Sequence, residues 1–213
     1  LVTAEALFME QGFRSTSLRE ITARAKVNLA AVNYHFGSKD ELVREVLRRR
    51  LGPLNAARVQ YLDRLEAESE GALPVERILE ALLVPALRIT RSPLEQGATV
   101  LRLLGRAFSE PGDYMKDFLP DQYREAARRF QAALARALPH LPEAELVWRM
   151  HFTFGAIAYV MAGDDALKLV AQCEAEASDD PEAIVQRLVP FLAAGFRAPL
   201  SPPADRSSDR AAA

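Results

Sequence analysis

The sequence predicts an all-α fold, and three features support this. Apolar residues recur three and four positions apart through most of the chain, and Pro, Gly, Ser or Asp stands at the ends of these stretches. No convincing run of alternating polarity indicates a strand. The 213 residues, 49% of them hydrophobic, suffice for one substantial domain or two small ones. We expect a small three-helix head at the N-terminus followed by a larger helical body.

Two short helices joined by a turn are predicted within residues 16–42. Ser17 and Glu20 form a capping box that starts the first helix at Leu18, because each side chain can satisfy a main-chain N–H of the other residue. Asn28 is a suitable N-cap for the second helix, in which Leu29, Val32 and Phe36 share one face. This is the pattern of a helix-turn-helix, whose second helix enters a DNA groove.

The outward face of the second helix, together with Arg19 of the first helix, predicts a DNA-reading surface. Small side chains allow close approach to a groove, while Arg, Asn and Ala side chains recognise guanine, adenine and the thymine methyl group. Base contacts are therefore expected from Arg19, Ala30, Ala31 and Asn33. Hydroxyl, imidazole and ammonium groups near helix starts position the DNA backbone, so we expect phosphate contacts from Tyr34 and Lys39, supported by Thr16, Ser17 and His35.

A second capping box, from Ser38 to Glu41, follows Gly37 and opens a third helix. With it, the first fifty residues resemble the N-terminal domain of TetR-family regulators. The residues that carry the resemblance are Gly12, Phe13, Thr16, Ser17, Ile21, Ala25, Val27, Tyr34, Phe36, Ser38, Lys39 and Leu42. Lys26 stands where the family usually has Gly in the turn, so a left-handed conformation there would cost about 1 kcal/mol.

Charge is distributed unevenly along the chain. Residues 1–50 contain nine Lys and Arg against six Asp and Glu, a net charge of +3, while the whole chain has a net charge of −2. This asymmetry suits a DNA-binding head on a neutral to acidic body. The single cysteine, Cys173, excludes an internal disulfide and a cysteine-only zinc site, as expected in a reducing compartment. No apolar run reaches about 18 residues and no leader pattern is visible, so we expect a cytoplasmic protein without membrane contact.

The head is expected to meet the body at residues 50–53, where Gly52 and Pro53 should break or kink a long helix. The predicted domains are a helix-turn-helix head at 1–50, a helical effector-binding and dimerisation domain at 51–198 and a disordered tail at 199–213. Within the body we expect helices at 75–90, 93–109, 113–138, 142–162 and 181–198, with a short helix and an acidic loop in 164–180.

The stretch 142–162 is apolar on nearly every side, which one small body rarely covers by itself. A second apolar stretch, 185–196, carries Ala193, Ala194 and Gly195, which permit close approach of another helix. Both features indicate a homodimer. The resemblance implies the same, since TetR-like proteins dimerise through their last two main helices and present two recognition helices about 34 Å apart.

Aromatic and Met residues in the body could be ordinary core or could line an apolar effector cavity. Arg149, in the most apolar helix, needs a carboxylate, a main-chain carbonyl or an anionic ligand. The segments around residues 28–39, 102–110 and 148–156 resemble the PsrA-like subgroup, whose members respond to long-chain fatty acids. This resemblance implies a fatty acid or acyl-CoA effector, contacted by Arg102, Phe108, Met115, Phe118, Trp148, Arg149 and Phe152.

The sequence thus predicts a DNA-binding transcriptional regulator, in the form of a repressor that binds a palindromic operator as a homodimer and is released by its effector. Two alternatives stay open, a TetR-like regulator of an unrelated apolar effector and a DNA-binding protein without a ligand. A small enzyme using His151 lacks support, because no catalytic or phosphate-binding motif accompanies that residue. We expect no cofactor and no metal.

Overall fold

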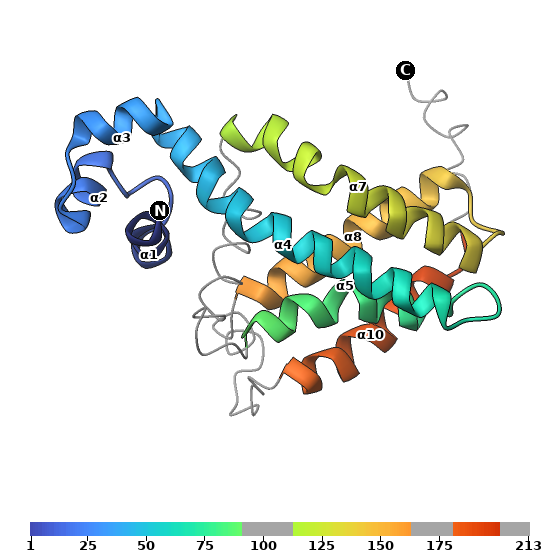
Figure 1. Ribbon diagram of the computed structural model, residues 1–213. Coiled ribbons are helices and arrows are strands. Elements are labelled where there is room, and N and C mark those ends of the chain that lie inside the picture. The colour runs from blue at the N-terminus through green and yellow to red at the C-terminus, as the bar shows by residue number, and fades with distance from the viewer. Residues whose placement is uncertain (91–112, 163–180, 201–213) are drawn as a thin grey trace, which may run out of the picture.

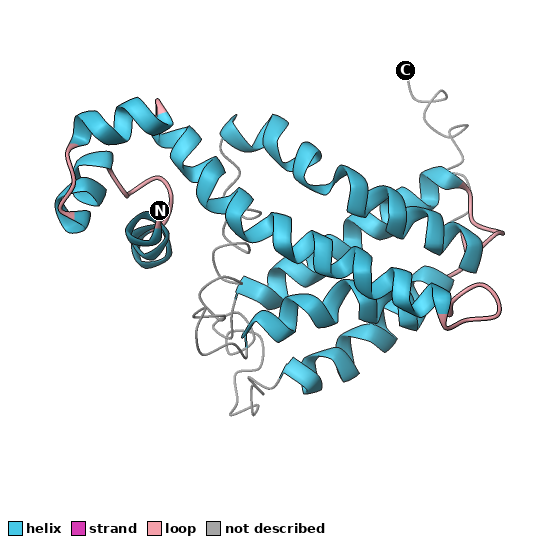
Figure 2. Ribbon diagram, in the orientation of Figure 1, coloured by secondary structure: helices cyan, strands magenta, loops and turns pink. Residues whose placement is uncertain are grey.

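The computed structural model describes residues 1–90, 113–162 and 181–200, and all regular secondary structure in these ranges is helical (Figure 2). The all-α prediction is confirmed. The helices are α1 (Val2–Gln11), α2 (Leu18–Ala25), α3 (Leu29–Phe36), α4 (Lys39–Ala67), α5 (Val75–Thr90), α7 (Asp113–Ala137), α8 (Glu143–Ala162) and α10 (Pro181–Arg197). The helix expected at 93–109, the segment 164–180 and nearly all of the predicted tail lie outside the described residues.

Side-chain caps start each of the three helices for which the sequence predicts one. The Ser17 hydroxyl accepts from the Glu20 N–H at 3.2 Å, and the Ser38 hydroxyl accepts from the Glu41 N–H at 3.1 Å. Asn28 Oδ1 accepts from the Ala30 N–H at 2.8 Å. Each cap satisfies a main-chain donor that the first helical turn leaves free, which is why the boundaries could be read from short sequence patterns.

Helix α4 connects the two parts of the molecule (Figure 1). It packs against α1 and α3 of the head and against α5 and α7 of the body. The break expected at Gly52 and Pro53 does not occur, because α4 continues through both residues. Leu51 and Leu54, on either side of them, are fully buried, and this packing holds the helix together where Pro53 removes one N–H donor. The predicted domain boundary therefore lies inside one helix.

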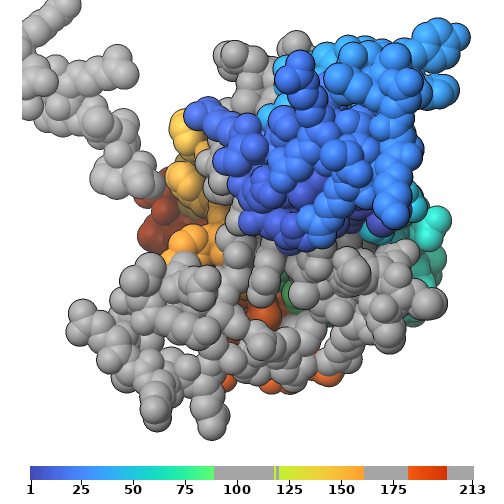
Figure 3. All heavy atoms as spheres, turned by 90° about the vertical axis from the view of Figure 1, so that its left-hand side faces the viewer, coloured from blue at the N-terminus to red at the C-terminus, as the bar shows by residue number. Residues whose placement is uncertain are grey.

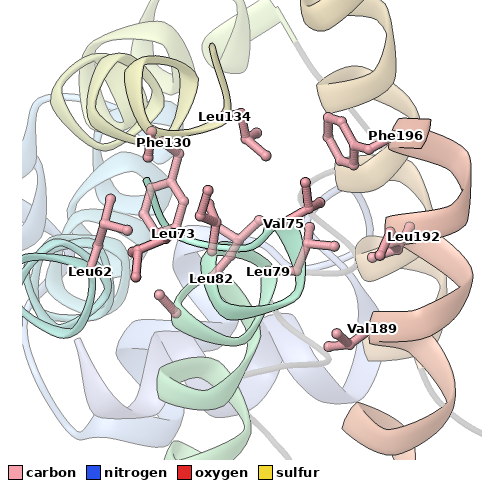
Figure 4. Packing of buried hydrophobic residues seen from close by; sticks show 14 of the residues in the cluster. Leu62, Leu73, Val75, Leu79, Leu82, Phe130, Leu134, Val189, Leu192 and Phe196 are labelled. Atoms are coloured by element: carbon pink, nitrogen blue, oxygen red, sulfur yellow. The ribbon is translucent and has the colours of Figure 1, made fainter. Parts of the chain in front are cut away.

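Two apolar clusters form the core. The first contains Phe8 and Phe13 of the head, Leu47 of α4 and Phe118 of α7, so it joins the head to the body. The second lies within the body, where Figure 4 shows Val189, Leu192 and Phe196 of α10 pointing toward α5. Across the described ranges, every helix is too short or too polar to cross a membrane.

Candidate nucleic-acid interface

The turn between α2 and α3 determines how α3 is presented. Lys26 ends α2 in the left-handed conformation, with φ 54° and ψ 43°. Its N–H donates to the Ala23 carbonyl at 3.3 Å, and the Val27 N–H donates to the Thr22 carbonyl at 3.0 Å. These bonds close the turn and direct the chain into α3. Lys26 is therefore in the strained conformation that glycine adopts without a steric penalty.

Helix α3 presents most of its surface to solvent, and none of its residues is buried. Leu29, Val32 and Phe36 are half-buried, and the last two pack against the core cluster that joins the head to the body. The opposite side exposes four of the side chains predicted to meet DNA. Tyr34 is 87% exposed, and Ala30, Ala31 and Asn33 are also exposed. His35 is exposed too, with its ring at the edge of the Tyr34 ring.

The other predicted DNA-contact residues surround α3 in different ways. Arg19 is exposed on α2, and Ser17 is exposed while capping that helix. Thr16, in contrast, is buried, and its hydroxyl bonds the Gly12 carbonyl at 2.8 Å and lies 3.2 Å from the Leu7 carbonyl. Its side chain therefore supports the loop from the inside and does not face a DNA backbone. Figure 3 shows the head from the side on which α1 to α3 face the viewer.

Lys39 has a second role that the sequence did not indicate. It is half-buried, and its Nζ donates to the Arg14 carbonyl at 3.0 Å, which ties the start of α4 to the loop before α2. An ammonium group has three N–H donors. Lys39 can therefore hold this loop and still donate to a phosphate oxygen.

Two ion pairs join helices of the head, one of them largely buried and the other half-exposed. Arg50 of α4 donates to the buried Glu5 of α1 through two bonds of 2.9 and 3.1 Å. Arg24 of α2 donates to Glu10 of α1 at 2.6 and 2.8 Å, and these hydrogen bonds hold the pKa of Glu10 below its ordinary value. Sequence reasoning missed both pairs, because their partners stand 45 and 14 residues apart.

The four predicted effector residues whose side chains are described do not gather around one cavity. Phe118 is buried, with the Arg48 guanidinium 5.6 Å from its ring centre. Trp148 and Phe152 lie on the surface, 58% and 64% exposed, with their rings stacked 5.8 Å apart. Arg102 and Phe108 lie outside the described residues, and so does the side chain of Met115.

Arg149 is buried, and its guanidinium is hydrogen-bonded within the protein. Its Nε donates to Glu145 at 2.8 Å, and its Nη1 donates to the carbonyls of Gly195 and Phe196 at 3.2 and 2.7 Å. Of the partners that the sequence left open for Arg149, the structure thus supplies a carboxylate and main-chain carbonyls. These bonds join α8 to the end of α10.

A small apolar cavity does exist in the body. Leu82 of α5, Phe130 of α7, and Met150 and Phe154 of α8 are among the side chains around it. Its free space is about that of one water molecule. Of the predicted effector residues whose side chains the structure describes, Phe118, Trp148, Arg149 and Phe152, none lies on its wall.

Helices α8 and α10 also leave an apolar surface uncovered. Val147, Trp148, Phe152 and Tyr159 are exposed along one side of α8, and Phe191 is 71% exposed on α10. Ala194 and Gly195 follow Phe191 on the same side of α10, and both are exposed. We call this set of residues the α8–α10 face. Both helices come from the two stretches that the sequence assigned to the dimer.

A protruding helix-turn-helix on a helical body defines a class of DNA-binding regulatory proteins. The sequence matches the family described as bacterial regulatory proteins, tetR family, over residues 1–46. It also matches the tetracyclin repressor-like C-terminal domain over residues 80–195, more than half of the chain. The chain belongs to the TetR family of transcriptional regulators. Because members of this family are regulators and not enzymes, the hypothesis of catalysis by His151 is set aside.

Relatives of known name share mainly the head. The transcriptional repressor Rv3405c of Mycobacterium tuberculosis is 53% identical over 47 residues, which are 22% of this chain and 25% of that protein. The repressor KstR2 of the same species is 35% identical over 78 residues, 37% of this chain and 36% of that protein. The matches thus span between a quarter and little more than a third of these relatives.

Solved structures resemble the whole chain at low identity. The structure of KstR2, described as a ketosteroid transcriptional regulator, has a TM-score of 0.57 and 19% identity, and the match covers 91% of each chain. The fatty acid degradation regulator FadR from Bacillus halodurans has a TM-score of 0.53 and 15% identity, with 91% of this chain and 96% of that chain covered. At such identities, these similarities establish the fold.

Proposed function

We propose that this protein is a transcriptional repressor that binds a palindromic operator as a homodimer. The observation that carries the proposal is the outward face of α3, where Ala30, Ala31 and Asn33 are exposed on a helix that protrudes from the head. Small side chains let the helix lie close to base edges, and an amide can pair with adenine. The relatives that share this head are named as repressors.

The roles of the head residues follow from where they lie. Arg19 on α2 and Asn33 on α3 read base edges, and the methyl groups of Ala30 and Ala31 meet thymine methyl groups. Tyr34 and Lys39 position the phosphate backbone, with Ser17 and His35 beside them. Thr16 contributes by holding the loop between α1 and α2 in shape.

The homodimer is supported by the α8–α10 face. Large exposed apolar side chains gathered on two adjacent helices mark a protein interface, because they are costly to leave in water. A two-fold axis through this face would bring four helices together and give the two heads one common direction. Two α3 helices about 34 Å apart would then fit successive major grooves.

Selection of bound sequences from a pool of random duplex DNA tests the DNA-binding proposal. We expect an inverted repeat whose half-sites lie about one helical turn apart, or a multiple of it. Enrichment of no sequence, or of one unrepeated sequence, would contradict the proposal.

For the effector, we propose a long-chain fatty acid or its acyl-CoA. FadR, which shares the fold, is named as a fatty acid degradation regulator, and the PsrA-like resemblance implies the same ligand class. KstR2, which also shares the fold, is named for ketosteroids, so a different apolar effector is the alternative. Such a ligand releases DNA only by preferring the conformation that fits the operator less well, and about 1 to 3 kcal/mol of coupling lowers operator affinity 5- to 150-fold.

Titration of fatty acids of increasing chain length into a fluorescent operator complex tests the effector. We expect release at concentrations below micelle formation, with a clear optimum of chain length. Release that follows micelle formation, or no release at any length, would contradict the fatty-acid proposal and leave the repressor proposal standing.

A further inference from the structure

Arg58 is a buried cation in the centre of the body. It lies on α4 and is only 4% exposed. Its Nε donates to the Leu82 carbonyl of α5 at 2.9 Å, and its Nη1 donates to Asn55 Oδ1 at 3.1 Å. It also shares a hydrogen bond with the side chain of Tyr123 on α7. All of these partners are uncharged.

The other arginines that are largely buried provide a comparison. Arg149 pairs with Glu145, and Arg50 pairs with Glu5. For Arg58, no ion pair with a carboxylate occurs among residues 1–90, 113–162 and 181–200. Within those ranges, Arg58 therefore differs from both by having a buried charge that no side chain neutralises.

Such a charge is unfavourable in an apolar interior unless an anion accompanies it. Burial lowers the pKa of Arg58, and burial also raises the pKa of Tyr123, so both groups are poorly solvated. A guanidinium has five N–H donors in a planar fork that matches a carboxylate. An anion placed here would gain charge-assisted hydrogen bonds that neutral oxygens cannot replace.

The same neighbours connect Arg58 to the apolar cavity. Leu82, whose carbonyl accepts from Arg58, also lines the cavity. The ring of Tyr123 meets the ring of Phe154, another cavity residue, edge to face at 6.2 Å. Met150, on the cavity wall, is unbranched and can change rotamer readily to enlarge the space. A polar cluster, with a cation that no carboxylate of the described residues neutralises, thus adjoins a small apolar cavity.

We infer that Arg58 binds the carboxylate of an amphiphilic acid whose hydrocarbon chain enters the cavity beside Leu82 and Phe154. The inference rests on the proposed function, because it makes this acid the effector. It also narrows the ligand to the free acid, since the thioester of an acyl-CoA has no carboxylate. Because α4 also packs against the head, a ligand at Arg58 contacts the helix that carries α1 to α3.

Calorimetric titration of the purified protein without DNA tests this inference. The probes are dodecanoic acid, dodecanol and dodecanoyl-CoA, each below its micellar concentration. We expect the wild-type protein to bind the acid at least about tenfold more tightly than the alcohol, because the acid alone forms charge-assisted bonds with Arg58. The thioester should bind no more tightly than the alcohol.

Arg58→Met and Arg58→Gln remove the charge, and in them the ratio of acid to alcohol affinity should fall to about one. The glutamine variant retains an amide donor for the Leu82 carbonyl and guards against misfolding of the methionine variant. Arg64→Met, an exposed arginine of the same helix, is the control and should keep the wild-type ratio. Circular dichroism and thermal unfolding establish that each variant is folded.

An equal affinity for acid and alcohol in the wild type, or an unchanged ratio in either folded variant, would overturn the inference. The DNA selection described above is independent of these titrations. If the selection enriched no inverted repeat while the acid still bound, the repressor proposal would be contradicted. If the operator were recognised but the acid did not bind, only the Arg58 site would be contradicted.

Discussion

The head and the α8–α10 face both expose residues that a buried helix would cover, but the exposed residues differ in kind. On α3 they are small or polar, as at Ala31 and Asn33, whereas on α8 and α10 they are large and apolar, as at Phe152 and Phe191. Small and polar groups fit the hydrated edges of bases, while large apolar groups exclude water against a second protein surface. This difference supports the two partners proposed above, DNA for the head and another copy of the chain for the body.

The largest effect should come from a charge placed in the α8–α10 face. In a two-fold interface, Ala194→Glu would bury an unpaired carboxylate twice, because each subunit contributes the same residue. We expect monomers in sedimentation and a loss of operator affinity of more than about 100-fold, since one head alone contacts only a half-site. Ala135→Glu, at an exposed alanine of α7, is the matched control and should leave the dimer intact. An Ala194→Glu variant that is still dimeric would place the interface elsewhere.

A smaller effect is expected from the base contacts of the head. Arg19→Ala should relax the preference for one base pair in each half-site, at a loss of about 1 to 3 kcal/mol of discrimination. Binding measured across a set of single-base operator variants gives this value. Arg24→Ala is the control, because the Arg24 guanidinium is bound by Glu10, and it should keep the preference. If Arg19→Ala discriminated among the operator variants as well as the wild type does, other residues would have to read the bases.

Lys39→Ala should weaken all sequences alike, because a phosphate contact carries no base information. The slope of log affinity against log salt concentration should fall by about one. Lys39→Arg retains the positive charge and should keep the slope. If the alanine variant instead changed sequence preference with the slope intact, Lys39 would act only through the loop that it holds at Arg14.

The sequence predicted the head in detail because its signals are local. Caps at Ser17, Asn28 and Ser38 act within three residues, so helix starts could be read directly and are found as expected. The inward turn of the Thr16 hydroxyl was not predicted, since it depends on the carbonyls of Leu7 in α1 and of Gly12, the residue that follows this helix. The same holds for the pair between Glu5 and Arg50, which needs the folded arrangement of α1 and α4.

The body was harder to predict, because its side chains meet partners far away in sequence. The helical pattern gave α5, α7, α8 and α10 close to their observed bounds. It did not distinguish inward from outward residues on α8, because nearly every position there is apolar. Trp148 and Phe152 were consequently predicted to line a cavity, whereas they lie on the surface. Arg58 was missed, since its burial depends on α5 and α7.

The smallest expected effect concerns the turn that orients α3. Lys26→Gly should stabilise the protein by up to about 1 kcal/mol, because glycine adopts the left-handed conformation without the steric penalty of a side chain. Chemical denaturation measures the change. Ala23→Gly, at an exposed position inside α2, should have the opposite sign, with a loss of about 1 kcal/mol. If Lys26→Gly left the free energy of unfolding unchanged, the strain of Lys26 would have to be offset by other interactions in the native turn.

A dimeric repressor requires that the head and the α8–α10 face act together on one operator. Operator binding measured on three duplexes tests this claim directly: the selected palindrome, a single half-site, and the palindrome with its half-sites moved apart by about half a helical turn, roughly 5 base pairs. Two chains should bind the palindrome tightly, and affinity for the other two duplexes should be lower by more than about 100-fold, because a rigid dimer can then engage only one half-site. Equal affinity for all three duplexes would contradict this claim.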